Sequence, residues 1–241
     1  MTTHAQMFRA LHHGRDAGDP LVLPGPWDAA SARAFADAGF PALATPSAGV
    51  SASLGYEDGR TPADEMFAAV ARIVRAVDVP VTADVEAGYG LNPKELVARI
   101  LQTGAVGCNL EDSDPATKVL GDPRRHADRL AQVRAEAGDA LFVNARVDTY
   151  LRGVADPAEA LARIRLYAAA GADCVYPIGV PPEHLPLLRA GTGIPINVGA
   201  PAVAPPLAEL GRLGATRITF GPGLQRRAHA AVQTIARELR G

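Results

Sequence analysis

The chain has 241 residues, of which 48% are hydrophobic and 21% are charged, and its formal net charge is −2. That length suits two small domains or one large α/β barrel, and the near-neutral charge gives no electrostatic basis for binding nucleic acid or an anionic membrane surface. No apolar run approaches the ~18 residues that a membrane span needs, and the first twenty residues lack the apolar core of a secretory signal, so we expect a cytoplasmic protein.

Short apolar runs rich in β-forming residues alternate with helical patterns along the chain. A recurring sequence pattern joins them: a helical segment ends in glycine, a small or apolar residue follows, and then a strand begins. Glycine is the left-handed residue that ends a helix at such a point. These glycines are Gly39, Gly104, Gly171 and Gly214. The predicted strands are Leu21–Pro24, Ala42–Thr45, Val81–Val85, Gly107–Glu111, Leu141–Ala145, Cys174–Pro177, Ile196–Val198 and Arg217–Phe220.

Helical segments follow the predicted strands, and several begin with a residue that can cap the first turn. The capping residues are Asp28, Thr61 before Pro62, Asn92 before Pro93 and Asp156 before Pro157. Examples of these helices are Ala29–Ala38, Ala63–Val77, Pro93–Gln102, Pro157–Ala169 and Arg226–Leu239.

Eight such units with nearly continuous apolar strands predict a closed parallel sheet, an α/β fold of the (β/α)8 TIM-barrel type. An open doubly wound sheet is the main alternative, but no G-x-G-x-x-G motif follows the first predicted strand. No linker or change of composition marks a second domain. Residues 1–241 are therefore predicted to form a single barrel domain.

Polar side chains collect where the predicted strands end, which is the rim that carries catalytic groups in such barrels. Strand periodicity puts Asp84 and Glu86 on one side of their strand, and likewise Asn109 with Glu111. Arg146 shares its side of the next strand with Asn144 and Asp148. Clustered carboxylates repel and are costly to bury, so a cation should lie among them, and oxygen ligands favour Mg²⁺ or Mn²⁺. The alternative is that these acids cap helices or pair with surface arginines.

At these residues the sequence resembles the isocitrate lyase and phosphoenolpyruvate mutase superfamily. The segment Val81–Gly90 (VTADVEAGYG) is similar to its D-x-D-x-G-[YF]-G metal motif, with glutamate in place of the second aspartate. Asn109–Asp112 resembles its strand-four E-D, and Asn144–Asp148 its A-R-x-D. Trp27–Arg33 and Leu54–Asp58 resemble its first two loops. The resemblance implies an α/β barrel, Mg²⁺, and a small 2-oxo or 2-hydroxy carboxylate substrate that passes through an enolate-like state.

The resemblance also implies roles for individual residues. The metal would be held, partly through water, by Asp84, Glu86 and Glu111, and Asp58 and Lys118 would serve at the reacting centre. Arg146 would clamp the substrate carboxylate. The further substrate-binding candidates are Trp27, Thr45, Pro46, Ser47, Asn109 and Asn197.

The loop after the fourth predicted strand departs from the lyases of the superfamily. They carry K-[KR]-C-G-H there, whereas residues 113–123 contain no cysteine. Cys108 and Cys174 fall within predicted strands, where buried free thiols are expected.

Three hypotheses about the function follow. The first is Mg²⁺-dependent cleavage of a C–C bond, by retro-aldol cleavage or decarboxylation. The second is P–C chemistry on phosphonopyruvate, with Thr117 or Lys118 acting. The third is a catalytically silent barrel that binds a metabolite.

Members of the superfamily commonly assemble as dimers or tetramers. We therefore expect a homo-oligomer, and a dimer formed by simple packing, because little of the chain follows the last predicted helix.

Overall fold

The eight predicted strands form a closed parallel barrel in the computed structural model, which describes residues 2–200 and 206–241. Strands β2 to β6 pair in chain order, and β1, β8 and β7 form a second set. Backbone hydrogen bonds from Ala44 to Pro24 (3.1 Å) and from Val175 to Pro195 (3.0 Å) join the two sets. The strands are β1 Leu21–Val22, β2 Leu43–Ala44, β3 Val81–Asp84, β4 Gly107–Leu110, β5 Phe142–Val147, β6 Cys174–Pro177, β7 Asn197–Gly199 and β8 Arg217–Thr219. The TIM-type α/β fold is thus confirmed.

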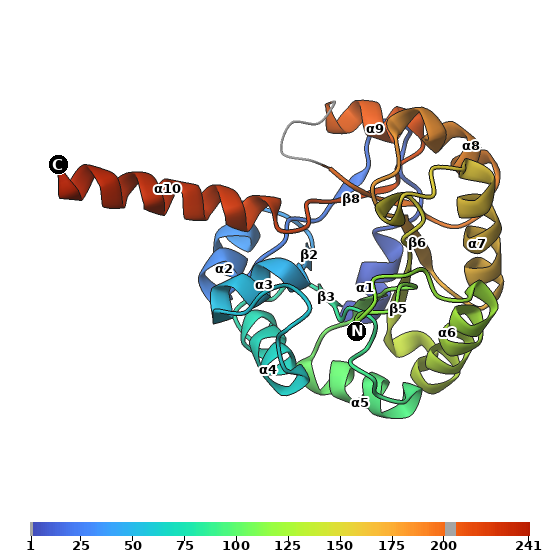
Figure 1. Ribbon diagram of the computed structural model, residues 1–241, viewed down its shortest axis with the longest axis horizontal. Coiled ribbons are helices and arrows are strands. Elements are labelled where there is room, and N and C mark those ends of the chain that lie inside the picture. The colour runs from blue at the N-terminus through green and yellow to red at the C-terminus, as the bar shows by residue number, and fades with distance from the viewer. Residues whose placement is uncertain (1, 201–205) are drawn as a thin grey trace.

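Helices surround the barrel as a ring (Figure 1). The predicted segment Pro157–Ala169 is a helix with the same bounds, and the other four helices given as examples lie within a few residues of their expected positions. The structure places the helices at α1 His4–Ala10, α2 Ala29–Asp37, α3 Ser47–Leu54, α4 Ala63–Val74, α5 Pro93–Thr103, α6 Pro123–Ala137, α7 Pro157–Ala169, α8 Leu185–Ala190, α9 Leu207–Leu213 and α10 Gly223–Arg240.

Three of the four predicted helix caps are confirmed. The side chains of Asp28, Asn92 and Asp156 each accept a hydrogen bond from a backbone N–H in the first turn of their helix. The expectation for Thr61 was wrong, because Pro62 occupies the cap position of α4. The Thr61 hydroxyl instead donates to the Ser51 hydroxyl at 2.7 Å, so it ties α4 to α3.

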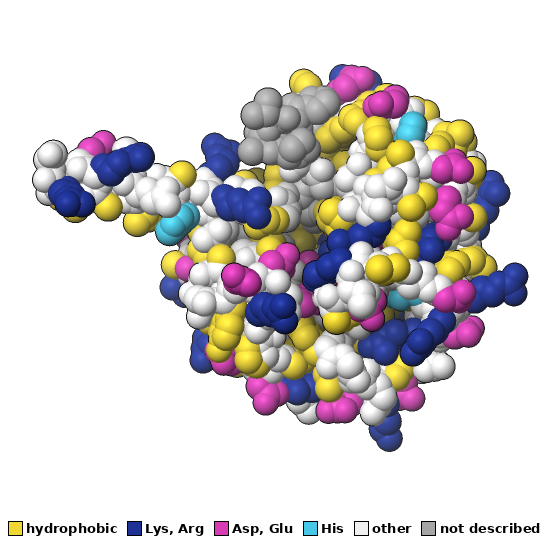
Figure 2. Space-filling view, viewed as in Figure 1, with side chains coloured by type: hydrophobic (Ala, Val, Ile, Leu, Met, Phe, Trp, Pro, Cys, Tyr) yellow, Lys and Arg dark blue, Asp and Glu magenta, His cyan; other side chains and the backbone are white. Residues whose placement is uncertain are grey.

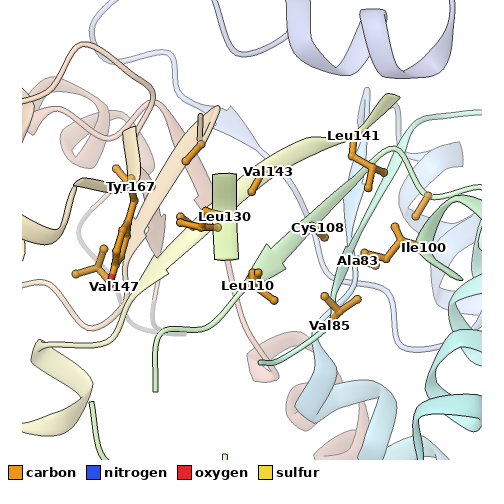
Figure 3. Close-up of a cluster of buried hydrophobic side chains, with 14 of the residues drawn as sticks. Ala83, Val85, Ile100, Cys108, Leu110, Leu130, Leu141, Val143, Val147 and Tyr167 are labelled. Carbon is orange, nitrogen blue, oxygen red and sulfur yellow. The ribbon is translucent and has the colours of Figure 1, made fainter. Parts of the chain in front are cut away.

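The core has two layers, one outside the barrel and one inside it. Side chains of alternate residues in β3, β4 and β5 pack against α5, α6 and α7, as Figure 3 shows for Leu110, Leu130 and Tyr167. At the other end of the interior, Phe8 of α1 packs edge-on against Phe142, with ring centroids 5.2 Å apart. Helix α1 therefore closes the N-terminal end of the barrel, opposite to the rim that carries the polar residues.

Helix α10 projects away from the barrel (Figure 1). None of its 18 residues is buried, and Val232, Ile235 and Leu239 are 59%, 54% and 84% exposed. The helix therefore presents apolar side chains that the described part of the chain leaves uncovered. Across the described part of the chain, no helix combines the length and the apolar character needed to cross a bilayer.

Candidate active site

A cavity of about 360 Å³ opens at the C-terminal rim of the barrel. In Figure 2 acidic and basic side chains lie next to one another near the centre of this face. Most of the residues singled out in the sequence line this cavity together, although they come from different strands and loops. They are Thr45, Pro46, Ser47, Asp58, Asp84, Glu86, Asn109, Glu111, Lys118 and Arg146.

Asp84 and Glu86 project into the cavity from the end of β3, as their two-residue spacing predicted. The Asp84 carboxylate accepts hydrogen bonds from the Ser47 hydroxyl at 3.1 Å and from the Glu86 N–H at 3.2 Å. The Asp84 N–H in turn donates to the Thr45 hydroxyl at 3.3 Å. Glu86 has a φ of +52°, in the left-handed region where a non-glycine residue is uncommon.

Arg146, on β5, lies between two carboxylates, and β5 is separated from β3 only by β4. Its guanidinium forms an ion pair with Glu111, and its Nε and Nη2 atoms lie 2.9 and 2.8 Å from one oxygen of Asp148, which is fully buried. Beside it, the Asn144 side-chain amide donates to Asn109 at 2.7 Å. Asp148 therefore holds the Arg146 guanidinium in place where it faces the cavity, whereas Asn144 bonds to Asn109.

The acids of the cavity hold protons more tightly than ordinary carboxyls. Burial, and then the charges of Asp84 and Asp58, raise the pKa of Glu86 to about 7. Burial is also the largest cause that raises the pKa of Glu111, to about 8, with Asp84 adding to it and Arg146 opposing it. Burial raises the pKa of Asp84 as well. When these acids are ionised, their negative charge is therefore under-compensated by the protein alone.

The three predicted metal ligands do not form a closed cage by themselves. Within residues 2–200 and 206–241, no three Asp, Glu, His or Cys side chains converge closely enough to hold a cation among them. Glu111 is drawn toward Arg146, and Asp84 toward Ser47. Mg²⁺ retains several waters and commonly uses one or two carboxylates directly. The under-compensated acids, all offering oxygen ligands, therefore fit a hydrated Mg²⁺, and their role as ligands stays a prediction.

The loop after β4 covers the mouth of the cavity. Its tip carries Lys118, whose φ is +59° and whose side chain reaches the cavity beside Asp58 and Gly59. The Thr117 hydroxyl donates to Asp114 at 2.9 Å and is absent from the lining, so of the two loop candidates the structure brings only Lys118 to the cavity.

One arginine that the sequence analysis did not identify holds the two ends of this loop together. Nη1 of Arg163 in α7 donates to Asp112 at 3.0 Å and to the Gly121 carbonyl at 3.1 Å, so it joins the two ends of the loop. The other oxygen of Asp112 accepts the Asp148 N–H at 2.9 Å. Arg163 lies about fifty residues from the loop in the sequence, and no local pattern pointed to it.

Two predicted substrate contacts lie outside the cavity lining. Trp27 packs edge-on against Phe35, with ring centroids 6.3 Å apart, at the barrel rim. Asn197 is fully buried inside the barrel, where it accepts a hydrogen bond from Thr219 at 3.2 Å. Conversely, Tyr176 and Arg152 line the cavity without having been predicted. Tyr176 could have been found, because it is an inward position near the end of β6.

Both cysteines are buried and free, as the sequence predicted. Burial raises the pKa of each thiol to about 12. Neither Cys108 nor Cys174 lines the cavity, so neither can replace the cysteine that the loop lacks.

Comparisons with known proteins agree with this geometry. The family model for phosphoenolpyruvate phosphomutase matches residues 8–240. An uncharacterized protein of Mycobacterium tuberculosis is 37% identical over 93% of this chain and 87% of its own length. The crystal structure of a putative phosphonomutase from Burkholderia cenocepacia J2315 superposes with a TM-score of 0.91 at 40% identity, covering 98% of both chains.

A more distant solved structure links the fold to a named lyase. The structure of 2,3-dimethylmalate lyase, described as a member of the PEP mutase/isocitrate lyase superfamily, superposes with a TM-score of 0.87 at 26% identity, covering all of this chain and 88% of the other. Family members are enzymes, both lyases and mutases. With its barrel, its acidic rim and its matched length, this chain belongs to the phosphoenolpyruvate phosphomutase family of the isocitrate lyase/PEP mutase superfamily.

Proposed function

We propose that this protein is a Mg²⁺-dependent lyase that cleaves a C–C bond in a small 2-oxo or 2-hydroxy carboxylic acid, by retro-aldol cleavage or decarboxylation. The observation that carries the proposal is the pairing, in one cavity of about 360 Å³, of under-compensated carboxylates with the buried Arg146 guanidinium. Such a cavity suits a small anion beside Arg146 and a cation among the neighbouring acids. The barrel fold and the family membership support an enzyme of this type.

Arg146 is suited to hold the carboxylate of the substrate. A guanidinium has five N–H donors, and its contacts with Glu111 and Asp148 leave donors free on both Nη atoms. Because Asp148 is fully buried and bound to Arg146, the guanidinium is oriented before substrate arrives. Thr45 and Ser47 offer further hydroxyls in the lining of the same cavity.

The chemistry would be divided between the metal and the loop. A bound Mg²⁺, held by Asp84, Glu86 and Glu111 partly through water, would supply electrophilic stabilisation of negative charge on a substrate oxygen. In a retro-aldol cleavage the Asp58 carboxylate at the mouth would accept the hydroxyl proton of the substrate. The electron pair of the broken C–C bond stays on the leaving carbon, and the Lys118 ammonium at the mouth would donate a proton to that carbon.

The composition of the loop favours cleavage that needs no special acid for the leaving group. Decarboxylation releases carbon dioxide, which leaves without a proton, and the enolate that remains can take its proton from water, so an enzyme for it can lack the loop cysteine. The likeness to 2,3-dimethylmalate lyase supports C–C bond cleavage among proteins with this fold.

The proposal is tested by turnover of a panel. Oxaloacetate and short 2-hydroxy diacids, with and without 2-alkyl groups, are incubated with the protein in Mg²⁺ or in chelator, and the products are followed by NMR. We expect at least one compound to be cleaved in Mg²⁺ alone, and the Glu136→Gln variant, changed at an exposed position on α6, to behave like the unmodified protein. If the folded protein leaves every compound intact, the proposal fails.

Phosphonopyruvate chemistry is a second candidate, favoured by one observation: Lys118 reaches the cavity from the loop. The 40% identity to a putative phosphonomutase also supports it. Phosphate or phosphoenolpyruvate formed from phosphonopyruvate would indicate this reaction. An equal rate in the Lys118→Ala variant would remove its basis. A catalytically silent barrel that binds a metabolite would instead bind oxalate or pyruvate in calorimetry. It would turn over neither the panel of oxo and hydroxy acids nor phosphonopyruvate.

A further inference from the structure

Arg217 is a cation enclosed inside the barrel. It lies on β8, paired with Leu21 of β1 and Asn197 of β7, and its side chain has no exposed surface. The guanidinium carbon lies 5.9 Å from the centre of the Phe8 ring, so the side chain points into the barrel toward α1. None of its three nitrogens has a hydrogen-bond partner among residues 2–200 and 206–241.

An isolated buried charge is among the most destabilising features a fold can contain. A charged group that leaves water must be paired with an opposite charge or its fold loses several kcal/mol. Burial lowers the pKa of the Arg217 guanidinium, but arginine stays protonated in proteins. The positive charge therefore remains, and a stable fold requires something to offset it.

No carboxylate among the described residues pairs with Arg217. Nδ1 of His12 donates to the Phe8 carbonyl at 2.8 Å, and burial, followed by the charge of Arg217, lowers the pKa of His12 to about 3, so this ring is neutral. Cys174 keeps its proton, because burial raises the pKa of its thiol to about 12. The charge of Asp84 acts on Arg217 without direct contact, because this carboxylate lies at the rim, where it accepts hydrogen bonds from Ser47 and from the Glu86 N–H.

A second unused donor lies next to Arg217. Asn197 pairs with it across β7 and β8, is fully buried, and has no partner for its Nδ2 atom in the described part of the chain. Both side chains start from paired positions inside the barrel, and both have N–H donors without a partner among the described residues. An eight-stranded barrel is filled almost completely by its own side chains, so its interior admits only a small ligand.

We propose that the barrel interior holds one small monovalent anion of chloride size, bound by the Arg217 guanidinium and the Asn197 side-chain amide. One negative charge balances one positive charge, and the anion accepts the N–H groups that have no other acceptor. The site is separate from the candidate active site, because neither residue lines that cavity. It therefore stands or falls independently of the proposed function. Water could occupy the same space, and unpartnered acceptors such as Asn144 Oδ1 would suit it, but water leaves the charge in place.

Anomalous diffraction tests the site directly. The protein is dialysed free of chloride and crystallised in sodium bromide, and bromide is located by its anomalous signal. We expect a peak within hydrogen-bond distance of Arg217 Nη and Asn197 Nδ2. Water-like density at that place with no bromide peak would overturn the proposal, whatever bromide binds on the surface.

Thermal unfolding gives an independent measurement on the unmodified protein. At equal ionic strength, Tm should be a few degrees higher in sodium chloride than in sodium methanesulfonate, whose anion is too large for the interior. Equal melting temperatures in the two salts would count against an anion site. Arg217→Met should abolish the difference, and Arg72→Met, at an exposed position on α4, should keep it. If Arg217→Met fails to fold, the comparison of salts and the bromide map decide the question.

Discussion

Replacing Glu111 by glutamine separates a metal site from a structural ion pair. The change keeps the shape of the side chain and removes one negative charge from the cavity. Burial raises the pKa of Glu111 from 4.5 to about 8. At about 1.4 kcal/mol per pKa unit, this shift corresponds to on the order of 5 kcal/mol in favour of the neutral form above pH 8. Glutamine is always neutral, so the metal-free variant should gain stability at that pH.

The gain should be smaller than this upper bound, because glutamine also gives up the ion pair with Arg146. Arg146 keeps Asp148 as its partner, so no buried charge is left alone. We therefore expect the metal-free Glu111→Gln variant to be about 1–3 kcal/mol more stable than the unmodified protein at pH 8.

The assay is thermal unfolding during a Mg²⁺ titration. The unmodified protein should gain about 2.7 kcal/mol when Mg²⁺ reaches a hundred times its Kd, and the Glu111→Gln variant should show no gain. Glu136→Gln changes the same residue types on the exposed face of α6, and it should respond like the unmodified protein. Melting of the unmodified protein that is indifferent to millimolar Mg²⁺ would refute the reasoning, as would an undiminished response in the Glu111→Gln variant.

Four further predictions follow from the same geometry. Arg146→Met leaves Asp148 buried without its main partner, so urea unfolding should show a loss of about 3–5 kcal/mol, and a loss below 1 kcal/mol would contradict the role of the pair. Because the folded-state pKa of Glu86 is raised to about 7, its contribution to metal-free stability is complete below about pH 4.5 and is lost as pH rises through 7. Melting temperatures in chelator should therefore fall from pH 5 to 8, and less steeply in Glu86→Gln; equal slopes would be inconsistent with the shift. Lys118→Ala, at an exposed loop position, should abolish turnover while Tm stays within about 1 °C, and retained turnover would exclude Lys118 from the reaction. The exposed apolar side chains of α10 predict a homo-oligomer in sedimentation, which Ile235→Glu should weaken; only monomer at micromolar concentration would disprove it.

The barrel fold and most of the side chains at its rim could be predicted from the sequence. Alternation of strands and helices determines the fold class, and the two-residue period determines which side chains face inward, so Asp84, Glu86, Glu111 and Arg146 could be placed in one cavity before any coordinates were known. Short-range capping chemistry likewise held at Asp28, where the side chain accepts a hydrogen bond from the third residue of the helix.

What the sequence could not supply depends on register and on contacts between distant segments. The Glu111–Arg146 ion pair follows from the alignment of β4 with β5, which no local pattern encodes. Asn197 was expected at the rim because it lies one residue before the end of a short predicted strand, whereas its pairing with Arg217 puts it deeper inside the barrel. The role of Arg163 in α7, which bonds to both ends of the loop after β4, could not be predicted for the same reason.

The central claim is that the rim cavity holds a divalent cation and a small carboxylate together, and one crystal structure would test it. Crystals grown with Mn²⁺ and oxalate allow the cation to be located by anomalous scattering. The account predicts one Mn²⁺ near Asp84, Glu86 and Glu111, directly or through water, with an oxalate carboxylate facing Arg146. A cavity that contains neither under saturating concentrations, or Mn²⁺ bound only elsewhere on the chain, would contradict it.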